Sequence, residues 1–220
     1  MKIGIIGAGR IGGNTARMFT RAGHEVLVSF SRDPDTLPAL AAELGDRARV
    51  GTAAEAATFG PVLMISVPWS AVDAALATAG SLAGKIVIDT TNQFIPGGLD
   101  DLGTQTGAQL NQARMPGARL VKAFNTLTAG FQAEAAGRVG ADRVVLFLCG
   151  DDADAKTTVA SLIDDAGFVP VDLGGLADAA PMEAPRRPAA VYGEEYHETE
   201  ARAFADQHRS RRRSETEPRA

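Results

Sequence analysis

Three glycines near the start of the chain have the spacing of a loop that binds a dinucleotide. The segment Gly7-Ala8-Gly9-Arg10-Ile11-Gly12 follows a short apolar run and opens a stretch of helical length that ends near Gly23. In that context the first glycine permits a tight turn, the second lets the backbone approach a pyrophosphate, and the third lets helix and strand pack closely. The helix N-terminus supplies amide donors for the phosphates. The sequence therefore predicts a dinucleotide site that includes Gly7, Gly9, Arg10, Ile11 and Gly12. The alternative is a glycine-rich turn without a ligand.

The end of the next apolar run indicates which dinucleotide binds. NAD sites usually place Asp or Glu about 20 residues after the glycines, where it holds the ribose hydroxyls. Here Ser31 and Arg32 occupy that place, and a hydroxyl beside a guanidinium suits the 2′-phosphate of NADP. The sequence thus favours NADP over NAD. Two alternatives remain: Asp33 binds the ribose, or Arg32 is a solvated loop charge.

Apolar runs alternate along the chain with longer stretches of helical length. Most of the runs are rich in Val, Ile and Leu and lack strict polar alternation, as strands covered on both faces do. The expected strands are 1–6, 25–30, 61–67, 85–88, 119–124 and 143–149, and the expected helices are 10–21, 35–44, 70–79, 106–114, 128–136 and 152–165. This repeated strand–helix–strand order predicts an α/β fold of the doubly wound Rossmann type, with a mostly parallel sheet and helices on both faces.

The composition changes after Leu173. Three prolines, Pro181, Pro185 and Pro188, exclude one long helix across that stretch, whereas 194–208 is expected to form a polar helix. The last twelve residues hold no large apolar side chain and are expected to be disordered. The expected organisation is therefore an NADP-binding domain over 1–175, an irregular, partly helical extension over 176–208 and a disordered tail over 209–220.

Charge and composition exclude several classes of function. The 220 residues include 22 Lys and Arg against 27 Asp and Glu, so the net charge of −5 offers no footprint for nucleic acid. One cysteine excludes an internal disulfide or a thiolate zinc site built from this chain alone. The longest apolar run, 144–149, is too short to span a bilayer, and the N-terminus resembles neither a signal peptide nor an anchor. We expect a soluble cytoplasmic protein with no metal, nucleic-acid or membrane partner.

Further short motifs follow the glycine loop in order over about residues 1 to 175. They are Gly23-His24-Glu25-Val26, Ser31-Arg32, Val67-Pro68-Trp69, Asp89-Thr90-Thr91-Asn92, Val121-Lys122-Ala123-Phe124-Asn125-Thr126, Cys149-Gly150-Asp151-Asp152 and Asp172-Leu173-Gly174-Gly175-Leu176. In this ordered set the sequence resembles the NADPH-dependent reductases of the deazaflavin coenzyme F-420 and their dinucleotide-binding relatives. The resemblance implies an NADP-binding Rossmann-type fold and a homodimer.

The resemblance also implies roles for residues beyond the expected strands, where open parallel sheets bind their ligands. It places Val67, Pro68 and Trp69 beside the ribose and nicotinamide, Thr91 and Asn92 in hydrogen bonds to the cofactor, and Asn125, Thr126 and Gly150 on the side of the hydride acceptor. The structural alternatives are that Pro68 and Trp69 end a strand, that Thr91 and Asn92 form a turn, and that Asn125 satisfies buried backbone. Asp151 and Asp152 are read as helix caps, and Cys149 as inert core.

The predicted function is an NADPH-dependent oxidoreductase that moves hydride between NADP(H) and a deazaflavin (coenzyme F-420) or flavin-like acceptor. Such a transfer needs stacking and distance rather than acid–base residues, so Asn125 is the single candidate for a catalytic role. A reductase of a small carbonyl or imine compound, the first alternative, would require a proton donor, and Tyr192, Tyr196 and Lys122 are unconvincing from sequence. The second alternative is an NADP(H)-binding sensor without turnover.

The sequence departs from the resemblance in its extension. The family's closing apolar helix is replaced by the proline-rich segment 181–188. Within it Arg186 and Arg187 are candidates to meet an anionic acceptor, and the alternative is that both are solvated charges.

Overall fold

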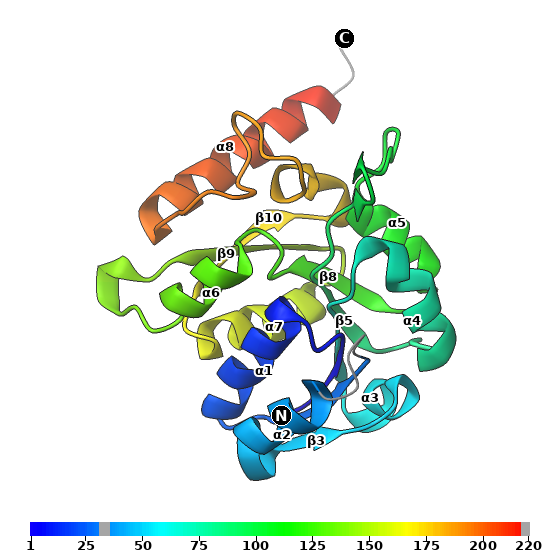
Figure 1. Ribbon diagram of the computed structural model, residues 1–220. Coiled ribbons are helices and arrows are strands. Elements are labelled where there is room, and N and C mark those ends of the chain that lie inside the picture. The colour runs from blue at the N-terminus through cyan, green and yellow to red at the C-terminus, as the bar shows by residue number, and fades with distance from the viewer. Residues whose placement is uncertain (31–35, 217–220) are drawn as a thin grey trace.

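A parallel sheet forms the centre of the molecule in the computed structural model, which describes residues 1–30 and 36–216 (Figure 1). Among these residues an eight-stranded sheet has the order β10-β9-β8-β5-β4-β1-β2-β3. All neighbouring strands pair in parallel except β8 and β9, which are antiparallel. The strands are β1 (Lys2–Ile6), β2 (Glu25–Ser29), β3 (Ala48–Val50), β4 (Val62–Ile65), β5 (Ile86–Asp89), β8 (Arg119–Ala123), β9 (Val145–Gly150) and β10 (Val169–Gly174). The predicted Rossmann-type α/β fold is confirmed.

Helices cover both faces of this sheet. One face packs on α1 (Arg10–Arg21), α2 (Thr36–Leu44), α6 (Ala129–Ala135) and α7 (Ala153–Asp165). The other packs on α3 (Ala53–Phe59), α4 (Val72–Ala79), α5 (Gly107–Arg114) and α8 (Glu198–Thr216). Along β4, Val62 and Met64 belong to the core on the face covered by α1. Leu63 and Ile65 belong to the core on the face covered by α3. Because both faces are covered, the strands read as unbroken apolar runs.

Shorter elements connect these layers. A two-stranded antiparallel hairpin of β6 (Phe94–Ile95) and β7 (Gly98–Leu99) lies between β5 and α5. Single 3-10 turns are η1 (Gly45–Arg47), η2 (Trp69–Ala71), η3 (Gly140–Asp142), η4 (Leu176–Asp178) and η5 (Ala180–Met182).

Asp152 caps α7 as predicted. Its side chain accepts from Ala155 N. That bond and the Arg119 guanidinium lower the pKa of the Asp152 carboxyl. Thr106 caps α5 in a reciprocal box with Gln109.

The C-terminal helix differs from the sequence prediction. A helix over 194–208 followed by a disordered tail was expected, but α8 begins at Glu198 and continues to Thr216. Ala201 and Ala205 are fully buried against β10, and Figure 1 shows α8 lying along that strand. Beyond them Arg209 donates to Asp172 O, and Arg212 pairs with Asp178. Contacts of Arg209 and Arg212 thus extend the predicted helix beyond residue 208, where the lack of large apolar side chains predicted disorder. Residues 217–220 lie outside the described residues.

None of the helices in 1–30 and 36–216 has the length and apolar character needed to cross a membrane. The same residues contain no group of three or more His, Cys, Asp or Glu placed to hold a metal ion. Cys149 is fully buried, which raises the pKa of its thiol well above the usual value, in line with its interpretation as inert core.

Candidate active site at the carboxyl edge of the sheet

The glycine loop has the geometry of an anion cradle. Gly7 has a φ of 110°, and a Cβ there would lie 2.2 Å from Ser66 O. A Cβ on Gly12 would lie 2.0 Å from Gly7 O, so these two glycines allow β1 and α1 to pack closely. At Gly9, by contrast, a Cβ would meet no atom of residues 1–30 or 36–216 within 4 Å. The open space at Gly9 is where a phosphate can approach the backbone.

Among the residues that the structure describes, no side chain caps the N-terminus of α1. Its N-cap is Gly9, and its first turn contains no acidic residue. The first amides of a helix have no acceptor within the helix, so those of Arg10 and Ile11 are available to an anion. A surface cavity of about 600 Å³ meets the loop at Ala8, Gly9 and Arg10. The geometry fits a bound pyrophosphate.

The residues predicted to choose NADP over NAD, Ser31 and Arg32, lie outside the described residues. Phe30, directly before them, accepts a hydrogen bond from Ala8 N at 3.1 Å. The end of β2 therefore lies beside the glycine loop.

The predicted segment after β4 lies at the same edge, and its residues differ in exposure. Val67 and Trp69 are 6% and 4% exposed, whereas Pro68 is exposed. The Trp69 indole donates to Asp100 at 2.8 Å, and the Arg114 guanidinium lies 4.5 Å from its ring centroid. Trp69 is therefore fixed by the chain itself, and Pro68 is the residue of this motif that faces solvent.

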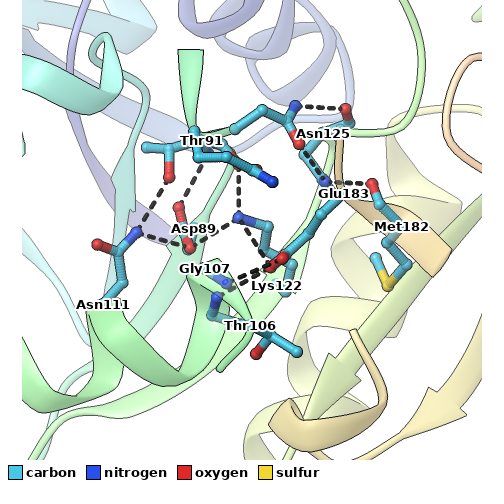
Figure 2. Close-up of polar contacts among 12 residues, drawn as sticks. Asp89, Thr91, Thr106, Gly107, Asn111, Lys122, Asn125, Met182 and Glu183 are labelled. Carbon is cyan, nitrogen blue, oxygen red and sulfur yellow. Dashed lines mark hydrogen bonds and ion pairs between the residues drawn. The ribbon is translucent and has the colours of Figure 1, made fainter. Parts of the chain in front are cut away.

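A buried ionic network lies where β5 and β8 end (Figure 2). Asp89 and Lys122 are register partners on these strands, both fully buried, with Lys122 Nζ 3.0 Å from Asp89 Oδ2. Asn111 of α5 donates to Asp89 Oδ2 and to Thr91 Oγ1. A buried charge is stable only when it is paired and hydrogen-bonded, and each of these groups has such partners.

Every polar group of Thr91 is engaged by this network. Its N–H donates to Asp89 Oδ1 at 2.9 Å, and its carbonyl accepts from Lys122 Nζ at 2.5 Å. Its hydroxyl oxygen accepts from Asn111 at 3.0 Å. The Thr91 side chain therefore orders the edge, and does not extend into an open site.

Glu183 of the C-terminal extension completes the network. Its side chain is 3% exposed, and its carboxylate accepts from the first two amides of α5, Gly107 N at 2.8 Å and Ala108 N at 2.9 Å. The carboxylate also lies 3.7 Å from Lys122 Nζ. A carboxylate at a helix N-terminus is stabilised by the helix dipole. The Asp89 and Glu183 carboxylates thus share the Lys122 ammonium group, and Glu183 alone also binds the N-terminus of α5.

Asn92 and Asn125 link the strand ends to that extension. Asn92 Nδ2 donates to Asn125 O at 3.0 Å, and Asn125 Nδ2 donates to Asn92 Oδ1 and, at 2.7 Å, to Met182 O. Asn125 and Thr126 are 4% and 2% exposed. Asn125 Oδ1 and Thr126 Oγ1 are buried without a hydrogen-bond partner. Both residues therefore lie at the expected edge but beneath the extension.

The structure corrects the placement of Gly150 and Asp151. Both were expected at the edge that holds Asn125. Because β9 runs antiparallel to β8, its carboxyl end lies at the opposite edge, where Gly150 pairs with Val121. Asp151 there accepts from Leu176 N. An apolar run does not reveal strand direction, so the sequence could not show this.

Sequence reasoning missed most of the ionic network. From the sequence, Asp89 is given only as a motif member and Lys122 also as an unconvincing proton donor, although a charged residue within a buried apolar strand is a usable signal. Asn111 and Glu183 gave none, because only the tertiary fold brings α5 and the extension to this edge.

Comparison with known families places this geometry among nucleotide-dependent reductases. A family model described as "NADP oxidoreductase coenzyme F-420-dependent" matches residues 2–93. The chain is 33% identical over 183 residues to the metalloreductase STEAP3 of Rattus norvegicus, covering 83% of this chain and 36% of that protein. The chain thus spans about a third of the length of the curated relatives it matches.

Solved structures show the same fold over most of the chain. A hypothetical protein from Sinorhizobium meliloti is 32% identical with a TM-score of 0.79, covering 90% of this chain and 96% of that one. A candidate F-420-dependent NADP reductase from Arthrobacter is 28% identical with a TM-score of 0.71, covering 81% and 87%. A reductive aminase from Aspergillus terreus, solved with NADPH and ethyl levulinate, is 25% identical with a TM-score of 0.60, covering 81% and 56%.

Proposed function

Since the chain belongs to the family of coenzyme F-420-dependent NADP oxidoreductases and their dinucleotide-binding relatives, we propose that it transfers hydride between NADP(H) and a deazaflavin acceptor. The cofactor is NADP(H), the dinucleotide of the family and of its NADPH-bound structural neighbours. The observation that carries the proposal is the contrast within the glycine loop. Gly7 and Gly12 are closed by their surroundings, whereas Gly9 faces open space at an uncapped helix end.

The described residues suggest how the chain contributes. The amides at the start of α1 would hold the pyrophosphate, and exposed Pro68 would border the nicotinamide side. Nicotinamide, when bound, supplies or accepts the hydride. Asn125 is proposed to border the acceptor side, with its unpartnered Oδ1 available to a donor after local opening. Thr126 shares that position.

One observation favours a second candidate, reduction of a small imine or carbonyl compound. Tyr192 of the extension packs 6.5 Å from the ring of Phe94, close in sequence to Asn92, and its burial raises the pKa of the phenol. A phenol that stays protonated near this edge is a proton donor such reductions need. The likeness to the reductive aminase points the same way.

An absorbance assay tests the acceptor. Purified protein, NADPH and oxidised deazaflavin are mixed, and the visible band of the deazaflavin is followed. We expect the band to disappear, faster with NADPH than with NADH. NADPH binding without loss of the band would contradict the deazaflavin proposal, and an imine substrate assayed with Tyr192→Phe as the comparison variant would then test the second candidate.

Arg32→Ala tests the choice of dinucleotide. If Arg32 holds the 2′-phosphate, its loss removes a charge-assisted contact that only NADPH makes. We expect the KM for NADPH to rise about tenfold or more, with little change in the KM for NADH. Steady-state kinetics with both cofactors measures this, and equal effects on the two would refute the assignment.

We propose that residues 1–175 form the NADP-binding domain, that the protein acts in the cytoplasm and that it forms a homodimer. Arg186 pairs with exposed Glu194 at 2.5 Å, so an anionic acceptor would compete with that ion pair.

A further inference from the structure

The C-terminal extension is tied directly to the carboxyl edge of the sheet. Asn125 Nδ2 donates to Met182 O at 2.7 Å, and Gln93 Nε2 donates to Ala184 O at 2.6 Å. Gly193 N donates to Thr126 O at 2.8 Å. Residues 182–193 therefore form part of the wall of this edge.

Glu183 lies between two of these ties and joins them to the ionic network (Figure 2). Its carboxylate bonds to the N-terminus of α5 and lies 3.7 Å from Lys122 Nζ. Lys122 in turn donates to Asp89 and to the carbonyl of Thr91. The Lys122 ammonium group thus contacts both the Glu183 carboxylate and the carbonyl of Thr91.

The position of Thr91 and Asn92 depends on the hydrogen bonds of this network and of the extension. The N–H, the carbonyl and the hydroxyl of Thr91 are all held by Asp89, Lys122 and Asn111. The next residue, Asn92, accepts from Ala184 N at 3.3 Å and exchanges side-chain bonds with Asn125. Phe124, directly before Asn125, is fully buried with a φ of 60°, a strained conformation for a bulky residue that its surroundings must hold.

We propose that Glu183 is a positioning residue for the nicotinamide half of the cofactor, an inference that rests on the proposed function. It acts through Lys122 and Thr91 and has no contact with the cofactor itself. Loss of its charge leaves Lys122 to Asp89 and Thr91 alone, and the edge that borders the nicotinamide then shifts. The pyrophosphate site at the glycine loop has its own supports in β1, α1 and Ser66 and stays unchanged.

Two ligands distinguish binding at the nicotinamide edge from binding at the glycine loop in one experiment. NADPH carries the nicotinamide, and 2′,5′-ADP carries only the adenosine with its 2′- and 5′-phosphates. The Kd for each is measured by fluorescence titration and competition for wild type and Glu183→Gln, together with thermal unfolding. Glu198→Gln is the matched control, because Glu198 is an exposed residue of the same extension and pairs with exposed Arg202.

We expect Glu183→Gln to leave the Kd for 2′,5′-ADP within about twofold and to reduce the preference for NADPH over 2′,5′-ADP about fivefold. Single-turnover hydride transfer should slow by about tenfold or more, since small displacements of reacting groups are costly. Glu198→Gln should change none of these values. An unchanged preference in folded Glu183→Gln, or a parallel rise of both Kd values, would overturn the proposal and leave Glu183 a structural cap.

The outcome is separable from that of the proposed function. If wild type binds NADPH but reduces no acceptor, the proposed function fails while the ratio of the two Kd values still tests Glu183. If wild type binds no NADPH, both fail. Should Glu183→Gln not fold, Gln93→Met removes a different tie to the same extension without changing a charge. It should reduce the same preference, and a folded Gln93→Met with wild-type preference would refute the proposal.

Discussion

Gly9→Ala is expected to abolish tight NADPH binding in a protein that folds normally. Gly9 has φ −72° and ψ −166°, an extended conformation that alanine adopts, and its Cβ would meet nothing within 4 Å. The added methyl group would instead occupy the space through which the pyrophosphate approaches the amides of α1. The Kd for NADPH should rise at least about tenfold, and the melting temperature should change little. Fluorescence titration and thermal unfolding measure the two effects.

The neighbouring glycines supply the contrast. Gly12→Ala should lower the melting temperature as well as binding, because its Cβ would lie 2.0 Å from Gly7 O. Gly137→Ala is the matched control, since its Cβ also meets nothing within 4 Å and Gly137 lies away from the loop in the sequence. Unimpaired NADPH binding by Gly9→Ala would mean that the cofactor does not approach this loop.

Lys122→Met is expected to have the largest effect on stability. Methionine is unbranched like lysine and one atom shorter, so the substitution keeps most of the packing but leaves the buried carboxylates of Asp89 and Glu183 without their cation. Removing one partner of a buried ion pair typically costs about 3–5 kcal/mol, a large part of the stability of an ordinary domain. Urea unfolding followed by circular dichroism measures the free energy of unfolding.

Lys156→Met is the control for this change. Lys156 pairs with Asp172 at 2.8 Å, but the two side chains are 20% and 46% exposed. Ion pairs in contact with solvent contribute about 0–1 kcal/mol, so Lys156→Met should lower stability far less than Lys122→Met. Equal losses in the two variants would show that the buried network contributes no more than a surface pair.

Much of the region around the glycine loop was predictable because its signals are local. The spacing of Gly7, Gly9 and Gly12 is a property of one turn and the helix after it, and the structure places all three as that spacing requires. The apolar runs of β1, β4 and β5 reflect burial on both faces, a consequence of the layers above and below. Helix ends were readable at Asp152 and Thr106 because capping is a contact over three residues.

The surroundings of Asn125 were less predictable because they depend on contacts between distant parts of the chain. Strand direction decides whether Gly150 shares an edge with Asn125, and no local pattern encodes the antiparallel pairing of β9 with β8. Tyr192 belongs to the irregular extension, and only the tertiary fold places its ring beside that of Phe94.

The sequence by itself indicated the Rossmann-type fold and the glycine loop, because both follow from spacing and periodicity within a few tens of residues. The family of oxidoreductases was indicated by the resemblance of an ordered set of motifs. Only the tertiary structure decided what surrounds the carboxyl edge. There Asp89, Lys122 and Glu183 meet from two strands and from an extension 61 residues after Lys122. The physical reason is desolvation: once the fold buries the Lys122 ammonium, its stability depends on carboxylates that only tertiary contacts can bring to it.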